Sequence, residues 1–117
     1  ELDAAIDSYK QALKIKPDHL AAMNSLAWIL ASAADAKLRN PEEAVALAEY
    51  VCQATEFQSP EPIDTVAAAY AAAGRFNEAI KASIQAIQLA DTNGQTGVAR
   101  QLRKRLSLYQ QGKPYVE

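Results

Sequence analysis

Apolar residues recur at intervals of three and four over most of this chain, the spacing that places side chains on one face of an α-helix. Within residues 1–15, Leu2, Ile6, Tyr9 and Leu13 follow this spacing and would form one apolar face. The same pattern predicts six helices, over residues 1–15, 19–33, 41–56, 60–73, 76–90 and 96–111. The inward side chains expected of the second and sixth are Met23, Leu26, Ala27, Leu30, Val98, Leu102, Leu106 and Tyr109.

Start and stop signals bound these segments. Pro17 ends the first helix, and Asp18 is placed to cap the second. Asn40 offers an N-cap, the proline after it suits the first helical position, and Glu43 can complete a capping box. Gly74 stands where a helix ends in the left-handed conformation. We therefore expect an all-α protein with short connections, apart from a longer loop over residues 34–39.

The chain also repeats itself. Residues 1–15 align with residues 75–89, and residues 24–27 align with residues 64–67, about forty positions later. Self-similarity at a fixed period is the mark of a stacked helical solenoid, a fold that presents extended surfaces to partners. Composition agrees, because 25 of 117 residues are alanine and only eight are aromatic. Alanine favours helices and lets them approach closely.

Charge and cysteine content limit the classes of partner and location that the chain can have. The net charge of −2 argues against general nucleic-acid binding, although residues 98–117 hold five basic groups and one acidic group. No apolar run is long enough to cross a bilayer, so we expect no membrane insertion. Cys52 is the only cysteine, which favours a cytoplasmic over a periplasmic location and excludes an internal disulfide. The chain opens inside a helical pattern without methionine, so we expect a fragment.

The joint pattern resembles the tetratricopeptide repeat, in which small and aromatic residues hold two antiparallel helices together. Residues 1–17 are similar to the second helix of a truncated repeat, residues 18–57 and 58–91 to full repeats, and residues 92–117 to a capping helix with a tail. The matching positions are Ala5, Tyr9, Pro17, Met23, Leu26, Ala27, Leu30, Ala44, Ala48, Ile63, Val66, Ala67, Tyr70, Gly74, Ala79 and Ser83. The resemblance implies an α-solenoid of antiparallel helix pairs wound as a right-handed superhelix.

The sequence departs from the family in two respects. Its period is about forty residues rather than about thirty-four, and Ala48 and Ser83 stand where an aromatic residue is usual. The segment from Leu26 to Ala44 is similar to a variant found near the C-termini of bacterial multi-repeat proteins. Sel1-like repeats, which have a similar length, are the alternative, but their glycine pattern is absent here.

The resemblance implies a concave groove lined by the first helix of each pair, where a partner's peptide or helix binds. The predicted groove residues are Asn24, Ser25, Trp28, Asp64, Thr65, Ala68, Arg100 and Arg103. Asn24 can clamp a peptide backbone because an amide both donates and accepts, and Trp28 would be a binding hot spot. In the alternative reading Asn24 is solvated, Trp28 packs under the 34–39 loop or against the first helix, and the basic residues form a solvated face.

Catalysis within the chain is not expected. His19 is the only histidine, Cys52 is expected to be a buried small hydrophobe, and no glycine-rich phosphate loop occurs. We therefore predict no enzyme activity, no cofactor and no metal site. The expected function is a protein–protein interaction scaffold. Two alternatives stay open: a substrate-positioning appendage of a larger glycosyltransferase or kinase, and a homodimer formed through an exposed apolar side of the first helix.

Overall fold

The computed structural model describes residues 1–117 and consists of helices and loops without any strand. The helices are α1 Leu2–Ile15, α2 Leu20–Ser32, α3 Pro41–Ala54, α4 Pro60–Ala72, α5 Phe76–Thr92 and α6 Thr96–Gln110. The six-helix prediction is confirmed, with every end within two residues of the expected position. The loop expected over residues 34–39 contains a short 3-10 helix, η1 (Ala36–Leu38), in which the Asp35 carboxylate accepts from Lys37 N at 3.0 Å.

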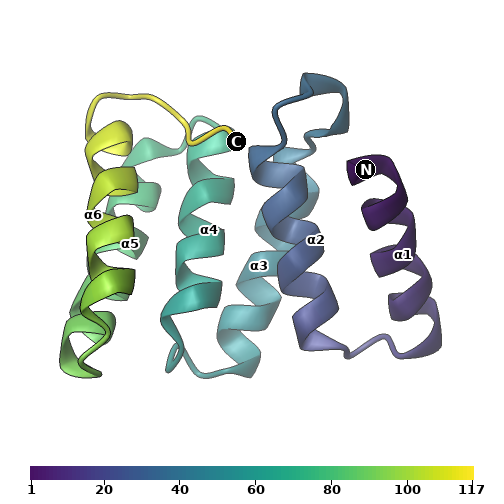
Figure 1. Cartoon of the computed structure of the whole chain (residues 1–117), viewed down its shortest axis with the longest axis horizontal. Coiled ribbons are helices and arrows are strands. Elements are labelled where there is room, and N and C mark those ends of the chain that lie inside the picture. The colour runs from purple at the N-terminus through teal and green to yellow at the C-terminus, as the bar shows by residue number, and fades with distance from the viewer.

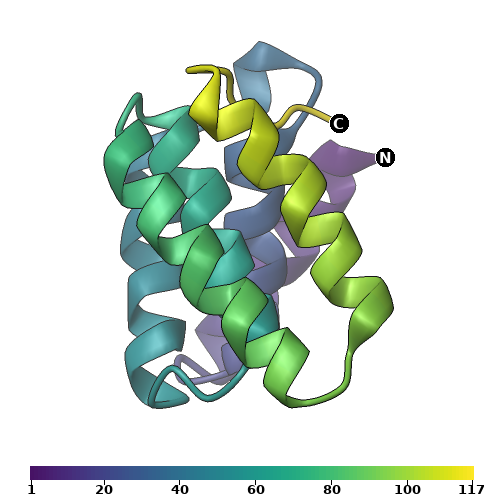
Figure 2. The same ribbon diagram turned by 90° about the vertical axis from the view of Figure 1, so that its left-hand side faces the viewer.

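Each helix packs against the next one along the chain, and α2 also packs against α4. Figure 1 shows α2, α4 and α6 running in the same direction in a front row, with α3 and α5 behind them. Figure 2 shows α6 and α5 side by side at one end of the stack. The Cα radius of gyration is 13.4 Å, the value expected of a compact domain of this length. None of the helices combines the length and apolar character needed to span a bilayer.

The predicted helix signals are mostly confirmed. Asn40 Oδ1 accepts from Glu43 N at 3.3 Å and so caps α3 as predicted. The predicted capping box is incomplete, because the Glu43 carboxylate accepts from the Asn40 side-chain amide at 3.2 Å, whereas Asn40 N donates to the Leu30 carbonyl. Gly74 has φ +79°, the left-handed value expected after α4. The prediction for Asp18 was wrong. The helix starts one residue later, so that His19 is the N-cap and its Nδ1 accepts from Ala22 N at 3.2 Å.

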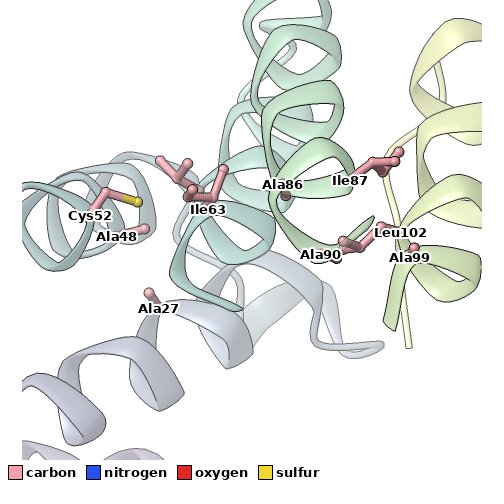
Figure 3. Packing of buried hydrophobic residues seen from close by; sticks show 10 residues of the cluster. Ala27, Ala48, Cys52, Ile63, Ala86, Ile87, Ala90, Ala99 and Leu102 are labelled. Carbon is pink, nitrogen blue, oxygen red and sulfur yellow. The ribbon is translucent and has the colours of Figure 1, made fainter. Parts of the chain in front are cut away.

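Small side chains fill the seams between the helices. Ala27, Ala48, Ala86, Ala90 and Ala99 are fully buried and belong to one cluster. Figure 3 shows how α6 joins this core, with Ala99 and Leu102 lying against Ala90 and Ile87 of α5. The expectation for Val98 was wrong, because it is 40% exposed. Val98 borders a hollow between α4 and α6 instead of the α5–α6 seam.

The apolar side of α1 is less open than expected. Ile6 is buried, and Tyr9 and Leu13 are partly buried against a cluster that includes Leu26 and Leu30 of α2. Only Leu2 on the predicted face remains largely exposed, at 41%. Ile6 cannot contribute to an interface without leaving this cluster, which reduces the apolar surface available for the predicted homodimer.

The alanine seams give a first prediction. Ala27→Leu or Ala67→Leu should lower the free energy of unfolding by about 1–3 kcal/mol, because both side chains are fully buried and added methylenes have no space. Urea unfolding followed by far-ultraviolet circular dichroism measures the change. Ala46→Leu on the exposed side of α3 is the matched control and should change stability by less than about 0.5 kcal/mol. Equal stability of all three variants would contradict the packing.

Candidate functional site

A hollow of about 400 Å³ opens between α2 and α4, with α6 contributing one side chain. We call it the groove, and its walls are Tyr9, Asn24, Ser25, Trp28, Ile29, Glu61, Asp64, Thr65 and Arg105. Five of the eight predicted site residues line it: Asn24, Ser25, Trp28, Asp64 and Thr65. They meet because α2 packs directly on α4, which brings equivalent positions of the two predicted repeats to one face.

Asn24 stands one helical turn before Trp28 on α2, so both side chains face the groove. The Asn24 Oδ1 atom is buried and has no hydrogen-bond partner within the chain. Most buried polar atoms in folded proteins are paired, so an unpaired acceptor in the wall of a hollow is notable. The Thr65 hydroxyl, by contrast, is used internally and donates to the Glu61 carbonyl at 3.1 Å.

Asp64 and Arg105 form a two-pronged ion pair across the groove. Arg105 Nη2 lies 2.8 Å from Asp64 Oδ2, and Arg105 Nε lies 3.1 Å from Asp64 Oδ1. The two side chains are only 12% and 17% exposed, so the pair is largely removed from water. Two parallel hydrogen bonds of this kind fix direction as well as charge. The pair therefore ties α6 to α4 in one orientation.

Burial and ion pairing have opposite effects on the pKa of Asp64 and on that of Arg105. Burial raises the pKa of Asp64 above its ordinary value, and the hydrogen bonds and charge of Arg105 offset only part of that rise. Burial lowers the pKa of Arg105, but Asp64, together with Tyr109 and Tyr115, raises it by more, so the guanidinium keeps its charge. The charged form of Asp64 thus depends on Arg105.

Arg100 and Arg103 were predicted to line the groove from α6, and neither does. Arg103 Nη2 pairs with Asp91 Oδ2 of α5 at 2.7 Å, and Arg100 is exposed outside the groove. The groove arginine is Arg105, which was not predicted. The missed signal is its spacing, since Arg105 follows the buried Leu102 by three positions and precedes the buried Tyr109 by four.

Ala68 was also predicted to line the groove, and that prediction was wrong. It is 1% exposed and packs in the cluster that contains Leu26 and Ala44. The close approach of α2 to α4 covers this position. Ala68 therefore contributes to the seam beneath the groove and offers no surface to a ligand.

Trp28 is partly buried and lies under the tail that follows α6, a contact that the sequence did not predict. Residues Lys113–Glu117, here called the return segment, leave α6 and run back past the end of α4 to α2 (Figure 1). The Tyr115 ring packs on Trp28 with centroids 5.6 Å apart, and Glu117 N donates to the Ser32 carbonyl at 2.8 Å. The indole Nε1 of Trp28 donates to the Glu117 carboxylate. The alternative expectation, in which Trp28 packs under the 34–39 loop or against α1, was wrong. The return segment covers Trp28 instead.

Arg105 connects the groove to the return segment. Its guanidinium carbon lies 5.4 Å from the Trp28 ring centroid and 5.3 Å from the Tyr115 ring centroid. Both distances fall within the range of cation–π attraction. One side chain thereby holds Asp64 by hydrogen bonds and two aromatic rings by its face, so that α2, α4, α6 and the return segment converge on it.

The remaining reactive residue types lie apart from the groove. Cys52 is fully buried, and burial raises the pKa of its thiol to about 12, so it stays a neutral thiol inside the core as predicted. No group of three or more histidine, cysteine, aspartate or glutamate side chains is arranged to hold a metal ion. The groove walls carry hydrogen-bonding and aromatic groups from Asn24, Ser25 and Trp28.

Comparison with protein-family models, with curated proteins and with solved structures found no match to this chain.

Proposed function

We propose that this chain is a protein-interaction module of the tetratricopeptide type, which binds an extended peptide or helix of a partner protein in its groove. The succession of antiparallel neighbours and the packing of α2 on α4 support this reading. So does the repeat pattern, which pairs Asn24 with Asp64 and Trp28 with Ala68. Under this proposal the helices form two full repeats, half a repeat and a cap.

The single observation that carries the proposal is the buried, unpaired Asn24 Oδ1 in the groove wall. Rotation of the Asn24 amide toward the groove would let a peptide N–H donate to this atom, while a side chain of the same peptide lies beside Trp28. The groups around the groove are held by helices and by the Asp64–Arg105 pair. Such preorganisation lowers the ordering that the module itself must undergo on binding.

The proposal predicts that Asn24→Ala weakens ligand binding without unfolding the chain. A random peptide library displayed on phage is selected against the wild-type chain, and selected peptides are titrated by calorimetry. Loss of one hydrogen bond of about 1–1.5 kcal/mol predicts an affinity about 5–10-fold weaker for Asn24→Ala. Trp28→Ala should weaken binding about 30-fold or more, as expected of a central aromatic contact.

Gln88→Ala is the matched control, because Gln88 is exposed on α5, behind the row that holds the groove. It should bind selected peptides like the wild type. Circular dichroism checks that every variant is folded. Failure to select any peptide, or equal affinity of Asn24→Ala and Gln88→Ala, would contradict a groove that reads peptides.

A further inference from the structure

The return segment lies in the structure as a bound peptide would. Tyr115 turns inward and packs on the cluster that contains Ala67 and Ala71 of α4, whereas Val116 turns outward and is 42% exposed. Glu117 is exposed, but its side chain points back to the domain, where the carboxylate accepts from Trp28, and its backbone N–H donates to Ser32. Alternation of side chains with a period of two is the behaviour of an extended chain. The domain therefore contacts the segment at two side chains, Tyr115 and Glu117, which are two positions apart.

Each inward group of the segment meets a matching group of the domain. The Tyr115 ring meets the Trp28 ring and the guanidinium of Arg105, and the Glu117 carboxylate accepts from the Trp28 indole. The backbone contributes as well, because Glu117 N donates to the Ser32 carbonyl. Trp28 thus contacts both the ring and the carboxylate, while Ser32 binds the main chain. Domains that bind extended peptides combine affinity with specificity through such main-chain and side-chain contacts.

We propose that Trp28, Ser32 and Arg105 form a recognition site for an extended segment with an aromatic residue two positions before an acidic one, and that the return segment occupies this site in cis. The inference rests on the proposed function, since both place peptide binding on α2, α4 and α6. It adds the class of ligand and a competition between a partner's segment and the chain's own.

The indole of Trp28, and not the guanidinium of Arg105, contacts the acidic side chain of the return segment. Arg105 directs Nε and Nη2 to Asp64 and turns its face to the two aromatic rings. The Glu117 carboxylate accepts its side-chain hydrogen bond from Trp28 Nε1. A segment with alanine in place of the acidic residue would leave this donor unpaired, and one with alanine in place of the aromatic residue would uncover Trp28.

The covalent link makes the return segment a strong competitor. A short connection to α6 gives it an effective concentration in the millimolar range or above. If the segment is seated in about nine molecules of ten, a free peptide of the same sequence binds the wild type about 10-fold more weakly than it binds a variant whose site has been emptied. The emptied variant should bind that peptide with a Kd of about 0.1–1 mM.

The test uses the full chain with Tyr115→Ala and Glu117→Ala together, and a synthetic peptide Lys-Pro-Tyr-Val-Glu blocked at both ends. Trp28 is the only tryptophan, so the indole N–H gives one signal in a nitrogen-15 correlation spectrum. The double variant should shift this signal from its wild-type position, and the peptide should return it in a saturable manner. Val116→Ala is the control and should leave both the signal and the peptide affinity at wild-type values.

Three results would overturn the proposal: an indole signal that does not move in the double variant, no saturable binding at millimolar peptide, or equal binding of peptides with alanine at the tyrosine or glutamate position. If the double variant fails to fold, Glu117→Ala alone is tested, because it removes only an exposed side chain. The two hypotheses fail separately. Selected peptides that depend on Asn24, without binding of the tyrosine–glutamate peptide, would keep the groove and reject the return-segment site, and the reverse result would do the opposite.

Discussion

Arg105→Ala is expected to lower the free energy of unfolding by about 3 kcal/mol, because it leaves the buried Asp64 carboxylate without its partner. The loss includes two charge-assisted hydrogen bonds and the contacts of the guanidinium with Trp28 and Tyr115. The value lies at the lower end of the range for buried pairs, because both side chains retain some contact with water. Urea unfolding monitored by circular dichroism gives the free energy directly.

Lowering the pH should reduce the loss of unfolding free energy that Arg105→Ala causes. Burial already raises the pKa of Asp64, and removal of Arg105 raises it further in the folded variant. The folded variant then takes up a proton more readily than its unfolded chain does. Its deficit relative to the wild type is therefore complete above the raised pKa of Asp64, and it shrinks as the pH falls through that pKa. Unfolding curves at neutral and acidic pH test the sign.

A double-mutant cycle supplies the control. Asp64→Ala together with Arg105→Ala should cost less than Arg105→Ala alone, since no uncompensated charge is left in the interior. Arg105→Lys should fall between wild type and alanine, because it keeps the charge but loses the two-pronged geometry. A deficit below about 1 kcal/mol for Arg105→Ala would show a solvated pair of ordinary surface strength.

Leu26→Ala is the second change with a large expected effect, again about 3 kcal/mol of unfolding free energy. Leu26 is 1% exposed and packs in the cluster that joins Ile6 of α1, Val45 of α3 and Ala69 of α4. Truncation removes three carbon atoms at a point where four helices meet. The surrounding helices are held by their own seams, so they can collapse only partly into the space, and the cavity adds to the lost burial.

The matched control for this change is Leu2→Ala, which makes the same truncation at a side chain that is 41% exposed on α1. Its cost should stay below about 1 kcal/mol, because little apolar area returns to water. Both variants are compared by urea unfolding at one protein concentration. Similar losses for the two truncations would mean that Leu26 is not at the centre of the packing.

Local patterns of the sequence predicted the helices well. The spacing of apolar residues, the Asn40–Glu43 cap and Gly74 each act within one or two helical turns, so their effect can be read without knowledge of distant contacts. The same local rules misplaced one cap, at Asp18, where two adjacent residues were both capable of capping. The alignment of residues 24–27 with residues 64–67 predicted that Asn24, Trp28 and Asp64 share one face, and the three residues do line one hollow.

The basic residues of α6 show what local sequence patterns cannot predict, namely which arginine faces the groove. Periodicity marked the apolar positions Leu102 and Tyr109 as inward, yet Arg105 lies on the same face. An arginine can bury its stem and present its charge to a partner, so its polarity does not reveal which way it turns. The carboxylate that holds it, on Asp64, lies 41 positions earlier in the chain.

By itself, the sequence determined six helices, their approximate ends, their alanine seams and the side of α2 that carries Asn24 and Trp28. Only the tertiary structure decided that Arg105 enters the groove, that Ala68 is sealed beneath it, and that Tyr115 and Glu117 cover Trp28. The reason is that helix formation depends on neighbours within a few residues, whereas the contact of Trp28 with Glu117 spans 89 positions. Such contacts follow from the rotation and approach of packed helices, which a one-dimensional pattern does not contain.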